Sequence, residues 1–144
     1  VDVPKKFQRL VQQPFITLAP GAGDRAKFWP LENYIQVAKI FESQNIQPVF
    51  ILGPSEVDWK EQIIKQVPNA LFPLQETSET SVYLTIALGQ LAELNIANDG
   101  GAAHLLALSN QPTIVIYKSI RILKKWHPNG SQVFPLLVQK YNQD

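Results

Sequence analysis

The fold is decided by the stretch TSVYLTIALGQLAELNIANDGGAAHLLALSNQPTIVIY, residues 80–117 of the chain. Its apolar pattern indicates a helix, a strand, a glycine-rich turn, a second helix and a second strand, in that order. The helices are indicated by apolar positions at helical spacing and the strands by short β-branched runs: Val82, Ile86 and Leu91; LNIA at 94–97; Leu105 and Leu108; TIVIY at 113–117. Such an order is typical of domains in which helices connect parallel strands.

The rest of the chain continues this alternation. Further strands are predicted at FITLA (15–19), PVFIL (48–52) and ALF (70–72), and further helices from these apolar positions: Leu31, Tyr34, Ile35, Ala38 and Phe41; Trp59, Ile63 and Ile64. The sequence therefore predicts one Rossmann-like α/β domain over residues 1–144, with a parallel sheet and helices on both faces. Residues 1–14 and 138–144 are expected to be peripheral.

Length and composition narrow the possible functions. With 144 residues and 45% hydrophobic content, the chain can form one domain with its own core. A formal net charge of +1 gives no overall field that would attract nucleic acid, so a partner must be recognised at a local site. The absence of cysteine excludes disulfides and thiolate metal sites. With only His104 and His127 and no close carboxylate spacing, we expect neither a metal nor a cofactor.

The sequence shows no membrane or export signal. No apolar run approaches the roughly 18 to 20 residues of a membrane span, and the start VDVPKKFQRL lacks the apolar core of a signal peptide. We therefore expect a soluble domain. The chain contains no methionine and begins at Val1, which fits either removal of an initiator methionine or a piece of a longer protein.

Glycines mark one edge of the predicted sheet. Five of the seven glycines follow a predicted strand directly: Gly21, Gly23, Gly53, Gly100 and Gly101. The edge beyond the carboxyl ends of parallel strands is where ligands bind in open α/β sheets, and glycine lets backbone amides approach a ligand closely. A phosphate-bearing ligand is the resulting prediction. The alternative for any single glycine is that it only permits a tight turn.

The first glycine loop is PGAGDRAKFWP, residues 20–30. It places Arg25 and Lys27 between a strand and a helix entered through Pro30, and cations beside free amides suit a diphosphate. Neither a Walker sequence nor GxGxxG is present, which disfavours the dinucleotide-binding domain of an oxidoreductase. The alternative for Lys27 is a solvated side chain in a surface loop.

The second glycine loop is NDGGAAH, residues 98–104. Asp99 is placed either to cap the following helix or to contact a ligand. His104 is either a base or a partly buried histidine with its hydrogen bonds satisfied.

The segments APGAGDRAKFWPLENY, VFILGPSE and residues 80–117 together resemble the C-terminal half of glycosyltransferase family 9, the heptosyltransferases. The family shows a PG(S/A) loop with KxWP, a strand ending in GGPxE, a TSL segment, and NDSGxxHLAAALGxPxxxLFGPT. The resemblance covers residues 15–117 with order and spacing kept. It implies the C-terminal, donor-binding domain of a two-domain GT-B glycosyltransferase that moves a heptose-like sugar from an ADP-sugar to a lipopolysaccharide-type acceptor.

The resemblance also implies roles for particular residues. Lys27 neutralises the diphosphate, Glu56 accepts hydrogen bonds from ribose hydroxyls, and His104 supports the loop that bears Asp99. The full set of nucleotide-sugar-binding residues that it implies is Gly21, Gly23, Lys27, Glu56, Thr80, Ser81, Asp99, Gly100, Gly101 and His104. Thr80 and Ser81 match the TSL segment and line the adenine side. The acceptor site and the catalytic base belong to an N-terminal domain, so no catalytic residue is expected here and the chain alone is expected to be inactive.

Two departures from the family pattern leave alternatives open. Gly100 stands where the family has Ser or Thr, and YKSI (117–120) replaces FGPT, followed by the basic stretch RILKK at 121–125. A non-catalytic nucleotide- or protein-binding module derived from the family is therefore the second hypothesis. The basic stretch is either a solvated loop or a contact to an anionic donor or membrane-surface acceptor. The expected location is accordingly the cytoplasm, either free or at the cytoplasmic face of the inner membrane.

Overall fold

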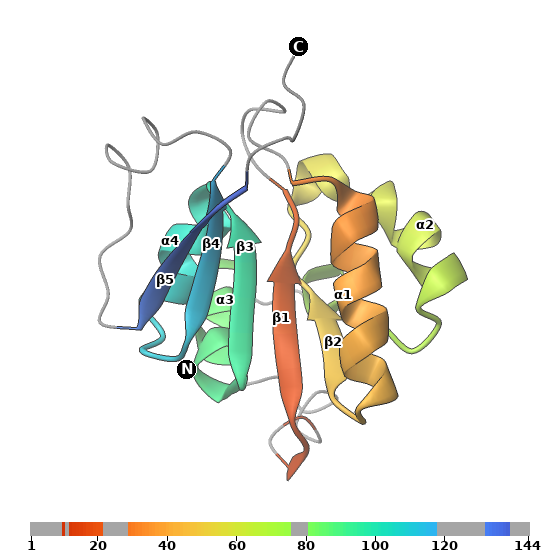
Figure 1. Cartoon of the computed structure of the whole chain (residues 1–144), viewed down its shortest axis with the longest axis horizontal. Helices are drawn as coiled ribbons and strands as arrows, with labels where there is room; N and C mark the ends of the chain where they lie inside the picture. Colours follow the sequence, from red (N-terminus) through yellow and green to blue (C-terminus); the bar gives the residue numbers. More distant parts are fainter. Residues whose placement is uncertain (1–9, 11, 22–28, 76–80, 118–131, 139–144) are drawn as a thin grey trace.

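The computed structural model describes residues 10, 12–21, 29–75, 81–117 and 132–138. Within them, five strands form one parallel sheet in the order β2-β1-β3-β4-β5 (Figure 1). The strands are β1 (Phe15–Ala19), β2 (Gln47–Phe50), β3 (Leu94–Asn98), β4 (Thr113–Tyr117) and β5 (Val133–Leu137). The helices are α1 (Leu31–Ser43), α2 (Trp59–Gln66), α3 (Ser81–Leu91) and α4 (Gly101–Ala107), with short 3-10 turns η3 (Pro54–Glu56) and η4 (Pro73–Gln75). The predicted Rossmann-like fold is confirmed.

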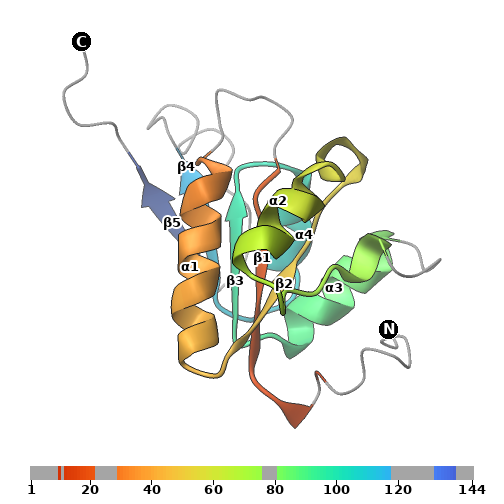
Figure 2. The same ribbon diagram turned by 90° about the vertical axis from the view of Figure 1, so that its right-hand side faces the viewer.

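The core has two layers, one on each face of the sheet. Figure 2 shows α1 and α3 on opposite sides of the strands. Ile16 and Leu18 of β1 belong to the cluster under α1 and α2, whereas Phe15 and Ala19 belong to the cluster under α3 and α4. Burial on both faces explains why the strands are nearly continuous apolar runs. Leu10, in the segment expected to be peripheral, is buried in the α3/α4 cluster.

The strand order places a switch point between β1 and β3. The chain leaves β1 through α1 to reach β2, and leaves β3 through α4 to reach β4, so the two connections run outward in opposite directions. The ends of the three strands lie side by side: Ala19 of β1 is opposite Ala97 of β3, and Leu18 of β1 is opposite Phe50 of β2. Diverging connections open a crevice beyond the carboxyl ends of the strands, which is the usual ligand site of such sheets.

One strand prediction was wrong, and one strand was not predicted. Residues 70–72 form only a single parallel bridge between Leu71 and Val49, because Pro73 begins η4 directly afterwards. The fifth strand is instead β5, which the sequence did not reveal because Pro135 interrupts its apolar run. Proline lacks an amide donor and is found on edge strands, and β5 is an edge strand of this sheet.

The inward face of α3 also differs from the prediction. Val82 and Leu91 are 44% and 40% exposed, and the positions that face the core are instead these: Leu84, Thr85, Ala87 and Leu88. The helix is apolar almost all round, so apolar spacing does not select a face.

Among the described residues, no helix has both the length and the apolarity that crossing a bilayer requires.

Candidate functional site

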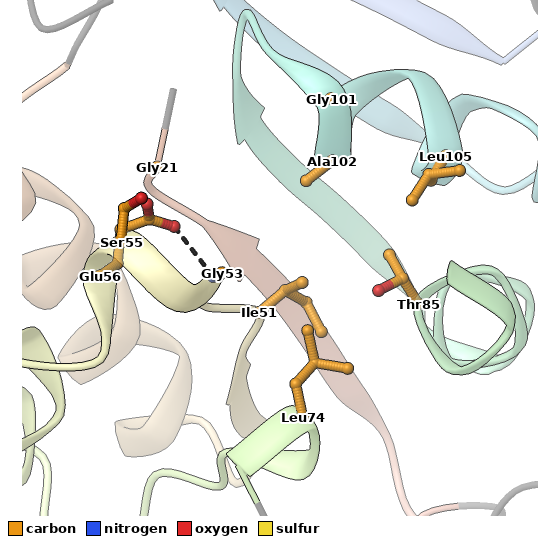
Figure 3. Close-up of a pocket in the computed structure, with 10 residues that line it drawn as sticks. All are labelled: Gly21, Ile51, Gly53, Ser55, Glu56, Leu74, Thr85, Gly101, Ala102 and Leu105. Atoms are coloured by element: carbon orange, nitrogen blue, oxygen red, sulfur yellow. Dashed lines mark hydrogen bonds between the residues drawn. The ribbon is translucent and has the colours of Figure 1, made fainter. Parts of the chain in front are cut away.

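A pocket of about 280 Å³ lies beyond the carboxyl ends of β1, β2 and β3 (Figure 3). It is close to the lower end of the range for small-molecule sites, about 300 to 1,000 Å³. The residues that line it come from the loops after these strands and from η3, η4, α3 and α4: Gly21, Ile51, Gly53, Ser55, Glu56, Leu74, Thr85, Gly101, Ala102 and Leu105. It therefore sits at the sheet edge where the glycine pattern predicts a ligand.

The pocket has an apolar part and a polar part. Ile51, directly after β2, and Leu74 of η4 extend into it, with Leu105 of α4 on the other side (Figure 3). Thr85 of α3 directs its hydroxyl oxygen toward the space between them. The carboxylate of Glu56 lies at the opposite end, between Gly21 and Gly53. Such a site suits a ligand with a flat apolar group at one end and hydroxyl groups at the other.

Glu56 is held in place by the turn that precedes it. The Gly53 amide donates a hydrogen bond to Glu56 Oε1 at 2.9 Å, and the Glu56 amide donates to the Gly53 carbonyl oxygen at 3.0 Å. A carboxylate offers about four acceptor sites, of which this hydrogen bond occupies one. The side chain is half-buried and can accept further hydrogen bonds from a ligand in the pocket.

Gly21 makes room for this carboxylate. A Cβ atom at Gly21 would overlap Glu56 Oε1 and Cδ, and one at Gly53 would lie 3.1 Å from Oε1. None of the described glycines has a positive φ angle. A positive φ angle therefore does not explain Gly21, and its lack of a side chain gives the Glu56 carboxylate room to approach.

The second glycine loop lies across the pocket from Glu56. Gly101 and Ala102, the first residues of α4, line the pocket, and Gly100 holds the N-cap position of that helix. The prediction that Asp99 caps α4 was wrong, because Asp99 lies one residue before the N-cap. Asp99 is 4% exposed, and its amide donates to the carbonyl oxygen of Ile116 at 3.2 Å. Asp99 is therefore buried, and it is not among the residues that line the pocket.

Tyr117, at the end of β4, is a second buried polar residue of this region. Burial raises the pKa of the Tyr117 phenol, and the negative charge of Asp99 raises it further. The phenol therefore stays neutral at physiological pH.

His104 is exposed on α4, so the alternative of a partly buried histidine was wrong.

Several predicted site residues cannot be placed. Gly23, Lys27 and Thr80 lie outside the described residues, and so does the side chain of Ser81. Their assignment to the diphosphate and to the adenine side stays a prediction.

The sequence missed most of the apolar lining. Ile51 was assigned only to a strand, and Leu74 to no element, because its wall position depends on the turn η4. Thr85 could have been found: it follows Ser81 by four residues, and residues at this spacing share one face of a helix.

Comparisons with known proteins agree with this geometry. The family model described as Glycosyltransferase family 9 (heptosyltransferase) matches residues 3–143. A search of curated protein sequences found no match. Among solved structures, E. coli ADP-heptose lps heptosyltransferase II is 20% identical with a TM-score of 0.74, covering 94% of this chain and 44% of that one. E. coli heptosyltransferase WaaC with ADP is 15% identical with a TM-score of 0.75, covering 88% and 38%. The family 9 glycosyl transferase from Veillonella parvula is 16% identical with a TM-score of 0.70, covering 100% and 44%.

These solved structures share the fold of the chain. The chain spans less than half the length of each of them.

Proposed function

Because the chain belongs to glycosyltransferase family 9 (heptosyltransferase), we propose that it is the donor-binding part of a glycosyltransferase that uses an ADP-sugar. The observation that carries the proposal is the Glu56 carboxylate, held by the Gly53 amide at one end of a pocket whose other end is apolar. A carboxylate in this position accepts hydrogen bonds from the two hydroxyls of a ribose, while Ile51 and Leu74 contact a base. The presence of ADP in the WaaC structure supports the choice of nucleotide.

The diphosphate is assigned to the two glycine loops. Lys27 and Gly23 belong to the first loop, and Asp99, Gly100 and Gly101 belong to the second loop. During transfer, the acceptor hydroxyl gives its proton to the catalytic base and its oxygen bonds to the anomeric carbon, while the bond from that carbon to the diphosphate oxygen breaks. The departing ADP takes the electron pair, and a cation with free amides stabilises its charge. In this assignment Thr80 and Ser81 lie on the adenine side, and His104 supports the second loop.

The complete reaction requires more than these 144 residues. The solved structures that match the chain are more than twice its length, and the proposal assigns the acceptor and the catalytic base to an N-terminal domain of the longer protein. The sugar is heptose-like and the acceptor is of the lipopolysaccharide type. The proposed location is the cytoplasm or the cytoplasmic face of the inner membrane. The nucleotide sugar is a substrate, and the proposal includes neither a metal nor a cofactor.

A second candidate function is a non-catalytic nucleotide-binding module. It is favoured by Gly100, which removes a hydroxyl that family members have at this position, and by YKSI at 117–120. The two candidates differ in transfer by the full-length protein, not in nucleotide binding by this chain.

Calorimetry with ADP, adenosine and UDP tests donor binding. The chain is expected to bind ADP more tightly than adenosine or UDP. Lys27→Ala should weaken the binding of ADP about tenfold or more and leave the affinity for adenosine unchanged, because a charge-assisted contact is worth about 1.5 to 3 kcal/mol. Glu56→Gln should weaken the binding of both ADP and adenosine, since it exchanges an acceptor oxygen for a donor. Lys39→Ala, on an exposed face of α1, is the matched control. Equal affinity for all three ligands would refute the proposed donor site.

A transfer assay tests the division of the enzyme. The isolated chain, incubated with ADP-heptose and a lipopolysaccharide-core acceptor, is expected to bind ADP without forming product, because it lacks the means to position the acceptor. Mass spectrometry detects sugar incorporation. Robust transfer would mean that an acceptor site lies within these 144 residues.

A further inference from the structure

Asn98 is a buried polar residue at the edge of the candidate site, and no step described above uses it. It is the last residue of β3 and is 1% exposed. Its side chain lies on the α1 face of the sheet, where it contacts α1 and both described ends of the β1–α1 connection. The residues with which it bonds are 64 to 78 positions away in the sequence.

The hydrogen bonds of Asn98 divide between the two halves of its amide. The Trp29 amide and the Tyr34 hydroxyl donate to Oδ1 at 3.1 and 2.9 Å. Nδ2 donates to the carbonyl oxygen of Pro20 at 2.7 Å and approaches that of Trp29 at 3.4 Å. Two donors face the oxygen and two carbonyl groups face the nitrogen, so the network fixes the orientation of the amide.

Pro20 and Trp29 lie near the two ends of the first glycine loop. Pro20 follows β1 directly, and Trp29 precedes Pro30, the N-cap residue of α1. One side chain therefore joins the start and the end of this connection to β3. The residues that follow Asn98 in the sequence are Asp99 and Gly100, the start of the second loop. Asn98 is thus the point at which both loops are attached to the same strand.

We propose that Asn98 is a positioning residue that holds Pro20 and Trp29 at the end of β3, next to the start of the second loop, and thereby supports diphosphate binding. This inference rests on the proposed function, in which the first loop carries Lys27 and the second presents Gly100 and Gly101. Asn98 itself lies behind the loops and is not among the pocket-lining residues. Its effect should therefore fall on the diphosphate and spare the nucleoside, which contacts Glu56 and the apolar wall.

A purely structural role predicts a different result. Asn95, three residues earlier on β3, is equally buried but bonds on the other face of the sheet, to Thr17 and Gly89. Truncating Asn95 should destabilise the domain without moving either loop. Asn95→Ala is therefore the control for lost stability, because it removes a buried amide from the same strand.

The experiment compares calorimetric affinities for ADP and adenosine in the 144-residue chain. Asn98→Ala should weaken ADP by about tenfold or more and adenosine by less than about twofold. Asn98→Asp, which keeps the volume and the acceptor oxygen but opposes a carboxylate oxygen to the Pro20 carbonyl, should have the same selective effect. Asn95→Ala should leave the ratio of the two affinities unchanged. A ratio that Asn98→Ala and Asn98→Asp leave intact would overturn the inference.

A measurement on the unmodified chain covers the case in which the variants do not fold. Hydrogen exchange of the Trp29 amide should slow more with saturating ADP than with saturating adenosine, because Asn98 couples this amide to the loops. Equal exchange with both ligands would overturn the inference.

If the unmodified chain binds neither ADP nor adenosine, the proposed function fails and this inference fails with it. If it prefers ADP and the Asn98 variants keep that preference, this inference alone fails.

Discussion

Asn95 and Asn98 stand three residues apart on β3, and each is buried and held by hydrogen bonds, yet they connect different parts of the molecule. Asn95 Oδ1 accepts from the Thr17 hydroxyl at 2.5 Å, and its Nδ2 donates to the Gly89 carbonyl oxygen at 3.2 Å. Asn95 thereby joins β3 to β1 and α3 inside the layer under α3 and α4. Asn98 instead joins β3 to a loop and to α1 on the opposite face.

The difference follows from strand geometry. Side chains alternate between the faces of a sheet, so residues separated by an odd number of positions lie on opposite faces. Position along the strand decides which elements each side chain can reach, because only the carboxyl end of β3 is adjacent to the connections that leave the sheet. The same residue type therefore stabilises the fold near the start of β3 and organises the site at its end.

The largest expected effect is the loss of stability on truncating Asn95, near the start of β3. Asn95→Ala should lower the free energy of unfolding by about 2 to 4 kcal/mol, because it leaves a buried hydroxyl and a buried carbonyl group without partners. Asn98→Ala should cost about 1 to 3 kcal/mol, since Trp29 is only half-buried and water can replace part of the network. Urea denaturation measures both. A larger loss of stability for Asn98→Ala than for Asn95→Ala would contradict the assignment of Asn95 to the fold and Asn98 to the site.

Gly21 and Gly101 both line the pocket but differ in the space that a side chain would find there. Gly21→Ala forces the Glu56 carboxylate to move, so ligand affinity should fall about tenfold while the flexible side chain limits the stability loss to about 1 kcal/mol. A Cβ atom at Gly101 meets nothing within 4 Å, so Gly101→Ala should leave stability unchanged or raise it by up to about 1 kcal/mol. Adenosine calorimetry and urea denaturation of both variants test this. Normal adenosine affinity in Gly21→Ala would remove Glu56 from the ligand site.

Tyr34 tests how far the Asn98 network depends on α1. Tyr34→Phe removes one donor to Oδ1 and should cost about 0.5 to 1.5 kcal/mol at neutral pH. Burial raises the pKa of Tyr34 well above its usual value near 10. Its contribution is therefore complete below about pH 10 and is lost as the pH rises toward the folded-state pKa.

The alkaline part of this prediction is measured by urea denaturation at neutral pH and above about pH 10. Tyr34→Phe should lose less stability across this range than the unmodified chain. Tyr83→Phe, which removes an exposed hydroxyl from α3, is the control. An identical alkaline loss in Tyr34→Phe and in the unmodified chain would show that this phenol stays solvated.

The smallest effect is expected at Glu32, which is exposed near the start of α1. Hydrogen bonds from Gln36 and then Gln66 lower the pKa of Glu32 below its usual value of 4.5, with a further contribution from Lys39. A lowered folded-state pKa gives stability that is present above pH 4.5 and lost as the pH falls through the folded value.

Glu32→Gln should therefore reduce the acid sensitivity of the melting temperature slightly and leave the preference for ADP over adenosine unchanged. Thermal melts between neutral and acid pH, with Glu61→Gln as the control on α2, measure the difference. A changed ligand preference would show that α1 transmits surface charge to the site.

The amino-acid sequence by itself determined the parallel α/β fold and the edge at which the pocket lies. Runs such as FITLA and TIVIY are buried on both faces, and glycines after strands mark the carboxyl edge, because these are local consequences of chain geometry. Gly21 was found in the same way, from its position after a strand, whereas Glu56 came only from the resemblance to the family. The apolar face of α3 was not, since a helix that is apolar all round carries no periodic signal.

Only the tertiary structure decided which distant residues share one environment. Asn98 bonds to Pro20 and Trp29, 78 and 69 residues away, and no local pattern encodes such partners. The need for glycine at position 21 arises from the Glu56 carboxylate, which a turn 35 residues away brings against it. Hydrogen bonds and close contacts of this kind depend on how elements pack across the sheet, whereas periodicity reports only which face of each element is buried.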